Sequence, residues 1–134
     1  MGVEFGEPFF QIHEDLNIDP TWEHHWEISY YEQDPDSAAV LFIYDVFVRT
    51  GPPIDILFMT SYEFDYFIEG DRWRSIDDYS EFDTLSKEAE CTVKPGSYHF
   101  VINHGYNDEM ASNEPPMKES YISVKAEARP IYRV

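Results

Sequence analysis

The segment Lys94-Pro95-Gly96-Ser97-Tyr98-His99-Phe100-Val101-Ile102-Asn103 carries the clearest strand pattern in this chain. Its Pro-Gly pair is typical of a type II turn, in which proline presets one φ angle and glycine accepts a positive φ at the next position. Behind the pair, Tyr98, Phe100 and Ile102 alternate with four other residues, which is the period of a β-strand. Upstream, Glu90–Val93 is interpreted as a second strand. The segment therefore predicts one hairpin of an antiparallel β-protein.

The same alternation marks strands at 22–31, 39–49, 54–59 and 121–128. The second and third of these are apolar on both faces, and their charged residues are Asp45 and the terminal Arg49 in the second and Asp55 in the third. Such strands are covered on both sides or lie at an interface. Pro130 is expected to end the last strand, because proline cannot donate a ladder hydrogen bond.

One short helix follows the strand at 54–59. Ser61 is a suitable N-cap, and Tyr62, Tyr66 and Phe67 fall on one helical face. Gly70 is placed to end the helix as its C-cap.

Together these patterns predict an all-β fold, an antiparallel, jelly-roll-like β-sandwich of about seven or eight strands with one short helix. Residues 1–20 are expected to form an N-terminal arm or edge strand, and residues 21–134 the sandwich domain. Phe5, Phe9 and Phe10 in the arm indicate an interface with a protein partner or with a second copy of the chain.

Charge is the strongest compositional signal, with 27 acidic residues against nine lysines and arginines and a net charge of −18. Three explanations compete: adaptation to molar salt, mimicry of nucleic-acid phosphates by an inhibitor of a DNA-binding protein, and a dedicated cation site. The even spread of acids and the scarcity of lysine favour salt adaptation, since molar salt screens self-repulsion within about 3 Å. Nucleic acid is not an expected ligand, because the chain has no basic patch to bind phosphates.

The cysteine content and the lengths of the apolar runs limit which disulfides, membrane spans and cellular locations we expect. Cys91 is the single cysteine, so no intrachain disulfide can form, and we expect a packed, inert thiol. The longest apolar run, Ala38–Tyr44, is far shorter than the roughly 20 residues of a membrane span. No signal peptide opens the chain, so we expect a cytoplasmic or virion protein, or an extracellular one if a signal was trimmed.

Between Val46 and Val124 the order of short motifs resembles a β-sandwich domain of secreted and surface proteins of halophilic archaea, which is loosely similar to bacterial pre-peptidase C-terminal domains. The matching motifs are Gly51-Pro52-Pro53-Ile54-Asp55-Ile56, Tyr62 with Tyr66 and Gly70, Ser80, Pro95-Gly96-Ser97-Tyr98 leading to Val101-Ile102-Asn103, and Glu114-Pro115-Pro116.

The resemblance implies a non-catalytic surface or appended domain from a halophile. Two features depart from the family pattern. Family members usually have a signal peptide or lipid anchor, and we expect neither in this chain. In addition, Ile102-Asn103-His104 replaces the family's Asp-Asn-Thr. Any ion or turn role of that aspartate cannot be carried over.

No residue pattern predicts catalysis or a transition-metal site. His24 and His25 are strand neighbours that point to opposite faces, so they cannot easily share a metal. The long polar loop after the Pro-Gly segment is the preferred binding candidate, and its oxygen donors leave Ca²⁺ possible although EF-hand spacing is absent. The candidate binding residues are Asn103, His104, Tyr106, Asn107 and Asp108.

The sequence thus predicts a non-enzymatic, halophile-adapted β-sandwich that acts through protein–protein contacts as an accessory or structural component of a surface or virion assembly. The alternatives are a carbohydrate- or calcium-binding module and an acidic DNA-mimic inhibitor. No cofactor is expected apart from the possible Ca²⁺.

Overall fold

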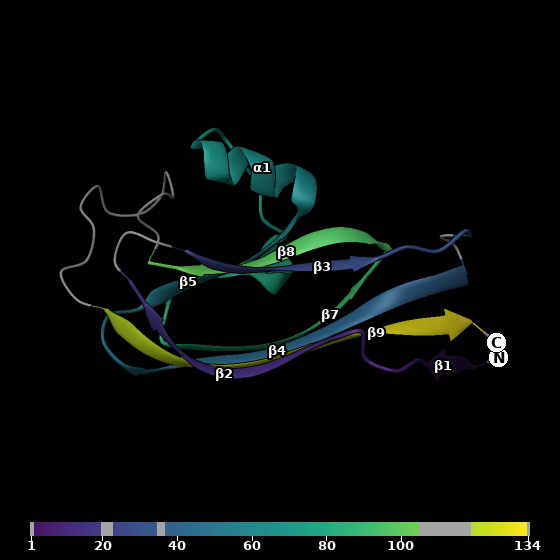
Figure 1. Ribbon diagram of the computed structural model, residues 1–134, viewed down its shortest axis with the longest axis horizontal. Coiled ribbons are helices and arrows are strands. Elements are labelled where there is room, and N and C mark those ends of the chain that lie inside the picture. Colours follow the sequence, from purple (N-terminus) through teal and green to yellow (C-terminus); the bar gives the residue numbers. More distant parts are fainter. Residues whose placement is uncertain (1, 20–22, 35–36, 105–118, 134) are drawn as a thin grey trace.

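The computed structural model describes residues 2–19, 23–34, 37–104 and 119–133, which form two antiparallel sheets packed face to face (Figure 1). The predicted all-β sandwich is confirmed. In order along the chain, the elements are β1 Val3–Phe5, β2 Phe10–Ile18, β3 His24–Tyr30, β4 Ala38–Thr50, β5 Ile54–Thr60, α1 Ser61–Glu69, the 3₁₀ helix η2 Asp77–Tyr79, β6 Glu81–Thr84, β7 Ser86–Val93, β8 Gly96–Asn103 and β9 Ser120–Arg133.

Sheet A has the order β1-β9-β4-β7, and β2 extends the β1 edge by pairing with the first part of β9. Sheet B has the order β3-β8-β5-β6. The longest pairing joins β4 to β9, from Ala38 opposite Tyr132 to Thr50 opposite Tyr121. Both termini lie at the same end of the sandwich (Figure 1).

The core between the sheets consists of the inward side chains of the alternating strands. Phe42 on β4 stacks on Phe58 of β5 with ring centroids 5.0 Å apart, and Phe100 of β8 meets Phe42 edge-on at 5.2 Å. Phe42 lies opposite Ala128 in the β4–β9 register. The small side chain on β9 leaves room for the aromatic ring beside it, which close packing of the core requires.

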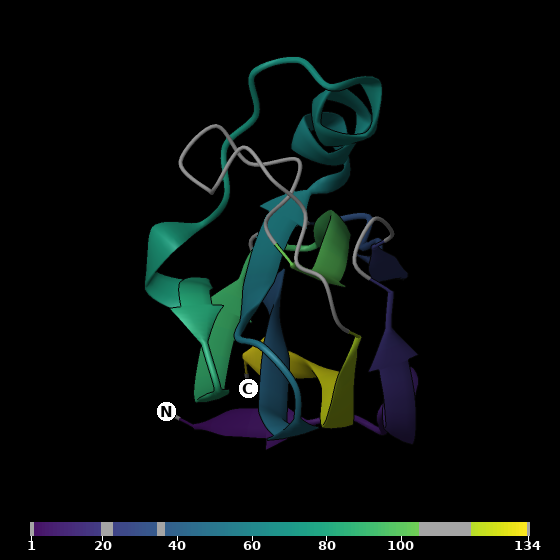
Figure 2. The same cartoon turned by 90° about the vertical axis from the view of Figure 1, so that its left-hand side faces the viewer.

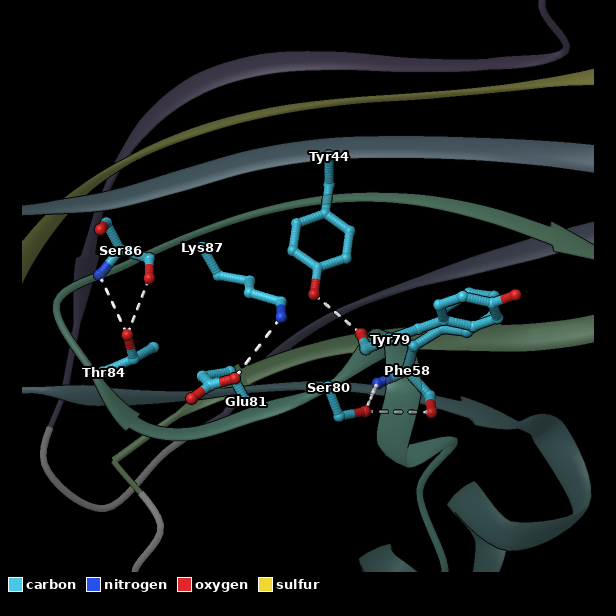
Figure 3. Close-up of polar contacts among 8 residues, drawn as sticks. All are labelled: Tyr44, Phe58, Tyr79, Ser80, Glu81, Thr84, Ser86 and Lys87. Atoms are coloured by element: carbon cyan, nitrogen blue, oxygen red, sulfur yellow. Dashed lines mark hydrogen bonds and ion pairs between the residues drawn. The ribbon is translucent and has the colours of Figure 1, made fainter.

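A polar contact also crosses the sandwich near its β6–β7 edge. Figure 3 shows Tyr44 pointing from β4 toward the backbone of Tyr79, whose carbonyl accepts from the tyrosine hydroxyl at 2.7 Å. Burial raises the pKa of Tyr44, so the hydroxyl stays protonated and donates. Beside it, Lys87 of β7 and Glu81 of β6 form an ion pair at 3.5 Å.

Helix α1 covers the outer face of sheet B (Figure 2). Its buried residues are Phe64 and Phe67, which pack with Leu57 and Met59 of β5 and Val101 of β8 in a second apolar cluster. This cover explains why β5 is apolar on both faces, as its sequence indicated.

Two details of the predicted helix are wrong. Its N-cap is Thr60, whose hydroxyl accepts from the Glu63 N–H at 3.2 Å, and not Ser61. Its buried residues are Phe64 and Phe67, so Phe67 of the predicted face is buried, whereas Tyr62 is exposed and Phe64 takes its place. The C-cap at Gly70 is confirmed, with φ of 78°.

The predicted hairpin at Pro95-Gly96 is wrong as well. β7 pairs with β4 in sheet A, whereas β8 pairs with β3 and β5 in sheet B. The residues between them carry the chain from one sheet to the other, and Gly96 does not adopt a positive φ. Both predicted strands are present, but they do not pair with each other.

Pro130 does not end the last strand, because β9 continues to Arg133. The N–H and C=O of one strand residue point to the same side, and the Pro130 carbonyl accepts from the Gly6 N–H at 2.8 Å. The missing proline donor therefore faces the break between β1 and β2 and not β4. Gly6 suits this close approach, since a Cβ there would meet Pro130 Cγ at 2.5 Å.

Gly51 and Gly70 offer a matched test of the packing at the start of β9. Gly51 has φ of 105°, and a Cβ there would overlap the Glu119 carbonyl oxygen and lie 2.8 Å from Ser120 Cα. A Cβ at Gly70 would meet nothing within 4 Å. We expect Gly51→Ala to lower the free energy of unfolding by about 2–4 kcal/mol, from backbone strain plus steric overlap. We expect Gly70→Ala to cost about 1 kcal/mol from its φ alone.

Urea unfolding of both variants in molar salt measures this difference. Equal losses of stability in the two variants would contradict the close contact between Gly51 and the start of β9.

Candidate functional site

The predicted loop site is only partly described by the structure. Asn103 ends β8, is 3% exposed and lies opposite Asp55 of β5. The Nε2 atom of His104 lies 2.9 Å from the carbonyl oxygen of Ile18. Burial lowers the pKa of His104. The neutral ring therefore donates its Nε2–H to that carbonyl. Tyr106, Asn107 and Asp108 lie outside the described residues, so a site that includes them stays a prediction.

The three phenylalanines of the N-terminal segment face different parts of the molecule. Phe5 lies opposite Ile131 on the outer face of sheet A and is exposed. Phe9 stacks on Tyr30 of the other sheet, with ring centroids 5.1 Å apart. Phe10 is half-buried against the central core. The structure does not bring the three rings together in one patch.

His24 and His25 lie on opposite faces of β3, as their alternation indicated. His24 is beside Trp26 on the inner face, while the ring of His25 lies 4.7 Å from Phe64 of α1 and 5.8 Å from His99. Within the described residues, no group of three or more His, Cys, Asp or Glu side chains is placed to hold a metal ion. Burial raises the pKa of the Cys91 thiol to about 12, which makes that thiol unreactive at neutral pH.

A network of hydrogen-bonded polar side chains joins the start of α1 to sheet B. The sequence did not reveal this network. Ser61 Oγ lies 2.9 Å from His99 Nδ1 and 2.6 Å from Ser97 Oγ. Ser97 in turn donates to Glu27 at 3.2 Å. His99 also stacks on Phe64, with centroids 3.9 Å apart and ring planes 4° from parallel.

A serine hydroxyl bonded to a neutral histidine is also the pairing of hydrolases. In this chain the imidazole lies flat under a helix side chain, and Ser61 bonds a second hydroxyl. Burial lowers the pKa of His99, and His25 acts in the same direction against the opposing effects of Glu27 and Asp65. We therefore infer that these hydrogen-bonded side chains hold α1 on sheet B and do not form a catalytic pair.

The outer face of sheet A is not covered by any described element (Figures 1 and 2). Along β4 it presents Leu41, Ile43, Asp45 and Phe47, because the alternate residues enter the core. Leu41 is 8% exposed, whereas Ile43 and Phe47 are 38% and 40% exposed. Ile43 and Phe47 are therefore the apolar side chains that β4 exposes on this face.

Four cationic side chains lie on the same face. Arg49 of β4 and Lys125, Arg129 and Arg133 of β9 all belong to its outward set, by alternation and register. They are four of the nine lysines and arginines in the chain. The outward strand residues also include five acids, so this face is close to neutral although the chain carries −18; the five are Asp15, Asp45, Glu88, Glu90 and Glu127.

A shallow groove of about 520 Å³ lies in the middle of this face. Its outward lining side chains come from three strands and are Gln11, His13, Ile43, Lys125 and Glu127. Arg129 binds Glu127 at 2.8 Å beside the groove, and Arg49 reaches Asp15 at 3.4 Å while covering the Phe47 ring at 5.3 Å. We call this surface, from β2 to β7, the outer A face.

The sequence indicated one part of the outer A face, since Asp45 is the single charged residue between Ala38 and Val48. It did not indicate that Asp45 lies opposite Lys125, which is 80 positions later in the chain, since that pairing depends on which strands become neighbours.

Neither a family model nor a curated protein nor a solved structure matches this chain. Among the described residues, no helix is long and apolar enough to cross a membrane.

The His99 contact predicts a specific pH dependence of stability. Because the pKa of His99 is lowered from 6.5 in the folded protein, the unfolded chain takes up a proton at a higher pH than the folded chain does. The stability that His99 contributes is therefore complete above about pH 6.5 and is lost as the pH falls below it. We expect His99→Asn, which keeps a polar atom near the Nδ1 position, to remove this loss.

Urea unfolding of both proteins between pH 7.5 and 5 measures the effect. We expect the wild type to lose stability relative to the variant by less than about 1 kcal/mol, because water screens a half-exposed imidazole. His104 and the acids are common to both proteins and cancel. Parallel pH profiles would show that His99 does not resist protonation in the folded state.

Proposed function

We propose that this protein is a non-enzymatic β-sandwich that acts through protein–protein contacts, as an accessory or structural component of a larger surface or virion assembly. The observation that carries the proposal is the outer A face. It exposes Ile43 and Phe47 on a central strand and carries four of the chain's nine lysines and arginines. The covered outer face of sheet B, by contrast, has its apolar residues packed under α1.

The composition of the surface supports a second part of the proposal, that the protein is adapted to high salt. Acids outnumber lysines and arginines three to one, and the described residues contain three ion pairs. Most carboxylates therefore have no cation beside them to reduce their mutual repulsion. At molar salt the Debye length is about 3 Å, so repulsion between separate surface carboxylates is largely screened.

This predicts that the fold loosens when salt is removed. Lowering KCl from about 2 M to 0.1 M should lower the thermal midpoint by about 10 °C, which corresponds to roughly 2–3 kcal/mol for a domain of this size. Circular dichroism during heating measures the midpoint. Sucrose at matched water activity is the control, because it stabilises compact states without screening charge. If sucrose restores the midpoint as well as KCl does, screening is not the cause.

The contact surface can be tested with a photocross-linking residue. We expect p-benzoylphenylalanine in place of Phe47, on the outer A face, to form a discrete cross-link to another polypeptide. The same residue in place of Tyr62 is the matched control, since Tyr62 is 68% exposed but lies on α1 on the opposite side of the sandwich. Irradiation of the purified protein, and of the protein in a lysate of its native cells, should give adducts from position 47 alone. Adducts from position 62 alone, or from neither position, would contradict the assignment of the contact face.

A further inference from the structure

One row of side chains crosses the outer A face, and its charge changes from positive to negative in the middle of the row. His13 of β2 lies opposite Lys125 of β9, Lys125 lies opposite Asp45 of β4, and Asp45 lies opposite Glu88 of β7. Residues in register on neighbouring strands share one face of the sheet. The row therefore presents a hydrogen-bond donor and a cation on one half of the face and two carboxylates on the other.

Within the described residues, these charged side chains form no close ion pair. Among the described residues, no oppositely charged group lies within 4 Å of Lys125, Asp45 or Glu88. The neighbouring row differs, since Glu127 is held by Arg129 at 2.8 Å and by Gln11 at 3.4 Å. The row from His13 to Glu88 is thus the part of the face whose charges are open to an external partner.

We propose that the outer A face binds a second copy of this chain, in a face-to-face dimer with a two-fold axis parallel to the strands and between β9 and β4. This rests on the proposed function and names the partner. Rotation about that axis exchanges the two halves of the face while keeping each row level. Lys125 then faces Asp45 of the second copy, and His13 faces Glu88 of the second copy. A two-fold interface must be complementary to itself, and this row meets that condition.

The apolar side chains of the face lie beside the charged row. Ile43 and Phe47 lie two positions before and after Asp45 on β4, so they flank the charged row on both sides. The rotation places Phe47 over Ser123 of the second copy, because Phe47 and Ser123 share a row in one chain. Ile43 is placed over Glu127, whose carboxylate is already bound by Arg129. Sheets that pack in the aligned manner keep their mean strand directions within about 30° of each other, and this arrangement satisfies that condition.

Repulsion between two chains of −18 each opposes any dimer, and the outer A face is where that repulsion is smallest. Its outward strand residues carry four cations against five acids. Molar salt screens the charges that remain far apart, whereas pairs in direct contact are screened much less. The dimer is therefore expected at high salt and dissociates as salt is lowered.

Sedimentation velocity in about 2 M KCl, from about 1 to 200 µM protein, tests the proposal. We expect the wild type to approach twice the 15.8 kDa of the chain as concentration rises. Lys125→Asp sets acid against acid at both symmetry-related places, and should weaken dimerisation about 100-fold or more. Lys125→Asp combined with Asp45→Lys restores the alternation of sign and should recover most of the association. Arg72→Asp, an equal change of charge on an exposed residue outside the sandwich strands, is the control and should have no effect.

A wild type that stays monomeric throughout this range, or a dimer that Lys125→Asp and Arg72→Asp weaken equally, would overturn the proposal. The cross-link from position 47 shows whether the dimer alone fails or the proposed contact function fails as well. A cross-link to a different polypeptide, with a monomeric wild type, contradicts the dimer and leaves the contact function standing. No cross-link of any kind, with a monomeric wild type, contradicts both.

Discussion

The long antiparallel pairing of β4 with β9 is the constraint on which the rest of the structure depends. It joins the central strand of sheet A to the end of the chain and fixes which residues point inward over its whole length. Phe42 and Tyr44 enter the core opposite Ala128 and Ala126, so bulk on one strand is matched by small side chains on the next. A slip of one residue would turn the aromatic rings to the outside and the charged row to the inside.

The same pairing builds the outer A face. By alternation, each residue that β4 or β9 sends into the core has neighbours that it sends out, so Asp45 and Lys125 lie side by side because Tyr44 and Ala126 do. Sheet B meets the same geometric demand by covering its outer residues with α1. Sheet A has no such cover among the described residues, so Ile43 and Phe47 stay exposed on its outer face.

The sequence was informative wherever the signal is local. Alternation located the strands around Phe42, Phe58 and Phe100, and Gly70 located the end of the helix, because side-chain direction and the left-handed φ are properties of a few adjacent residues. The hydrophobicity of β5 on both faces predicted a strand that is covered on both sides or lies at an interface, and α1 provides the cover.

The sequence did not indicate which strands pair with each other. Pro95-Gly96 was interpreted as a hairpin turn because adjacent strands usually pair. In this chain β7 and β8 belong to different sheets, and a short link is equally able to join two sheets. The charged row was unpredictable for the same reason, since His13, Asp45, Glu88 and Lys125 meet only once the strand order is known. The proline in β9 shows the converse, because an unfavourable residue is tolerated where its missing donor faces an interruption in the edge.

The central claim is that the uncovered face of sheet A, and not the helix side, meets the partner. Hydroxyl-radical footprinting with mass spectrometry tests it on the unaltered protein in molar salt. At low protein concentration, Phe47 and Tyr121 on the outer A face and Tyr62 on α1 should all be oxidised, since all are exposed. At high concentration, the account predicts protection of Phe47 and Tyr121 with Tyr62 unchanged. Protection of Tyr62, with Phe47 and Tyr121 still oxidised, would contradict it.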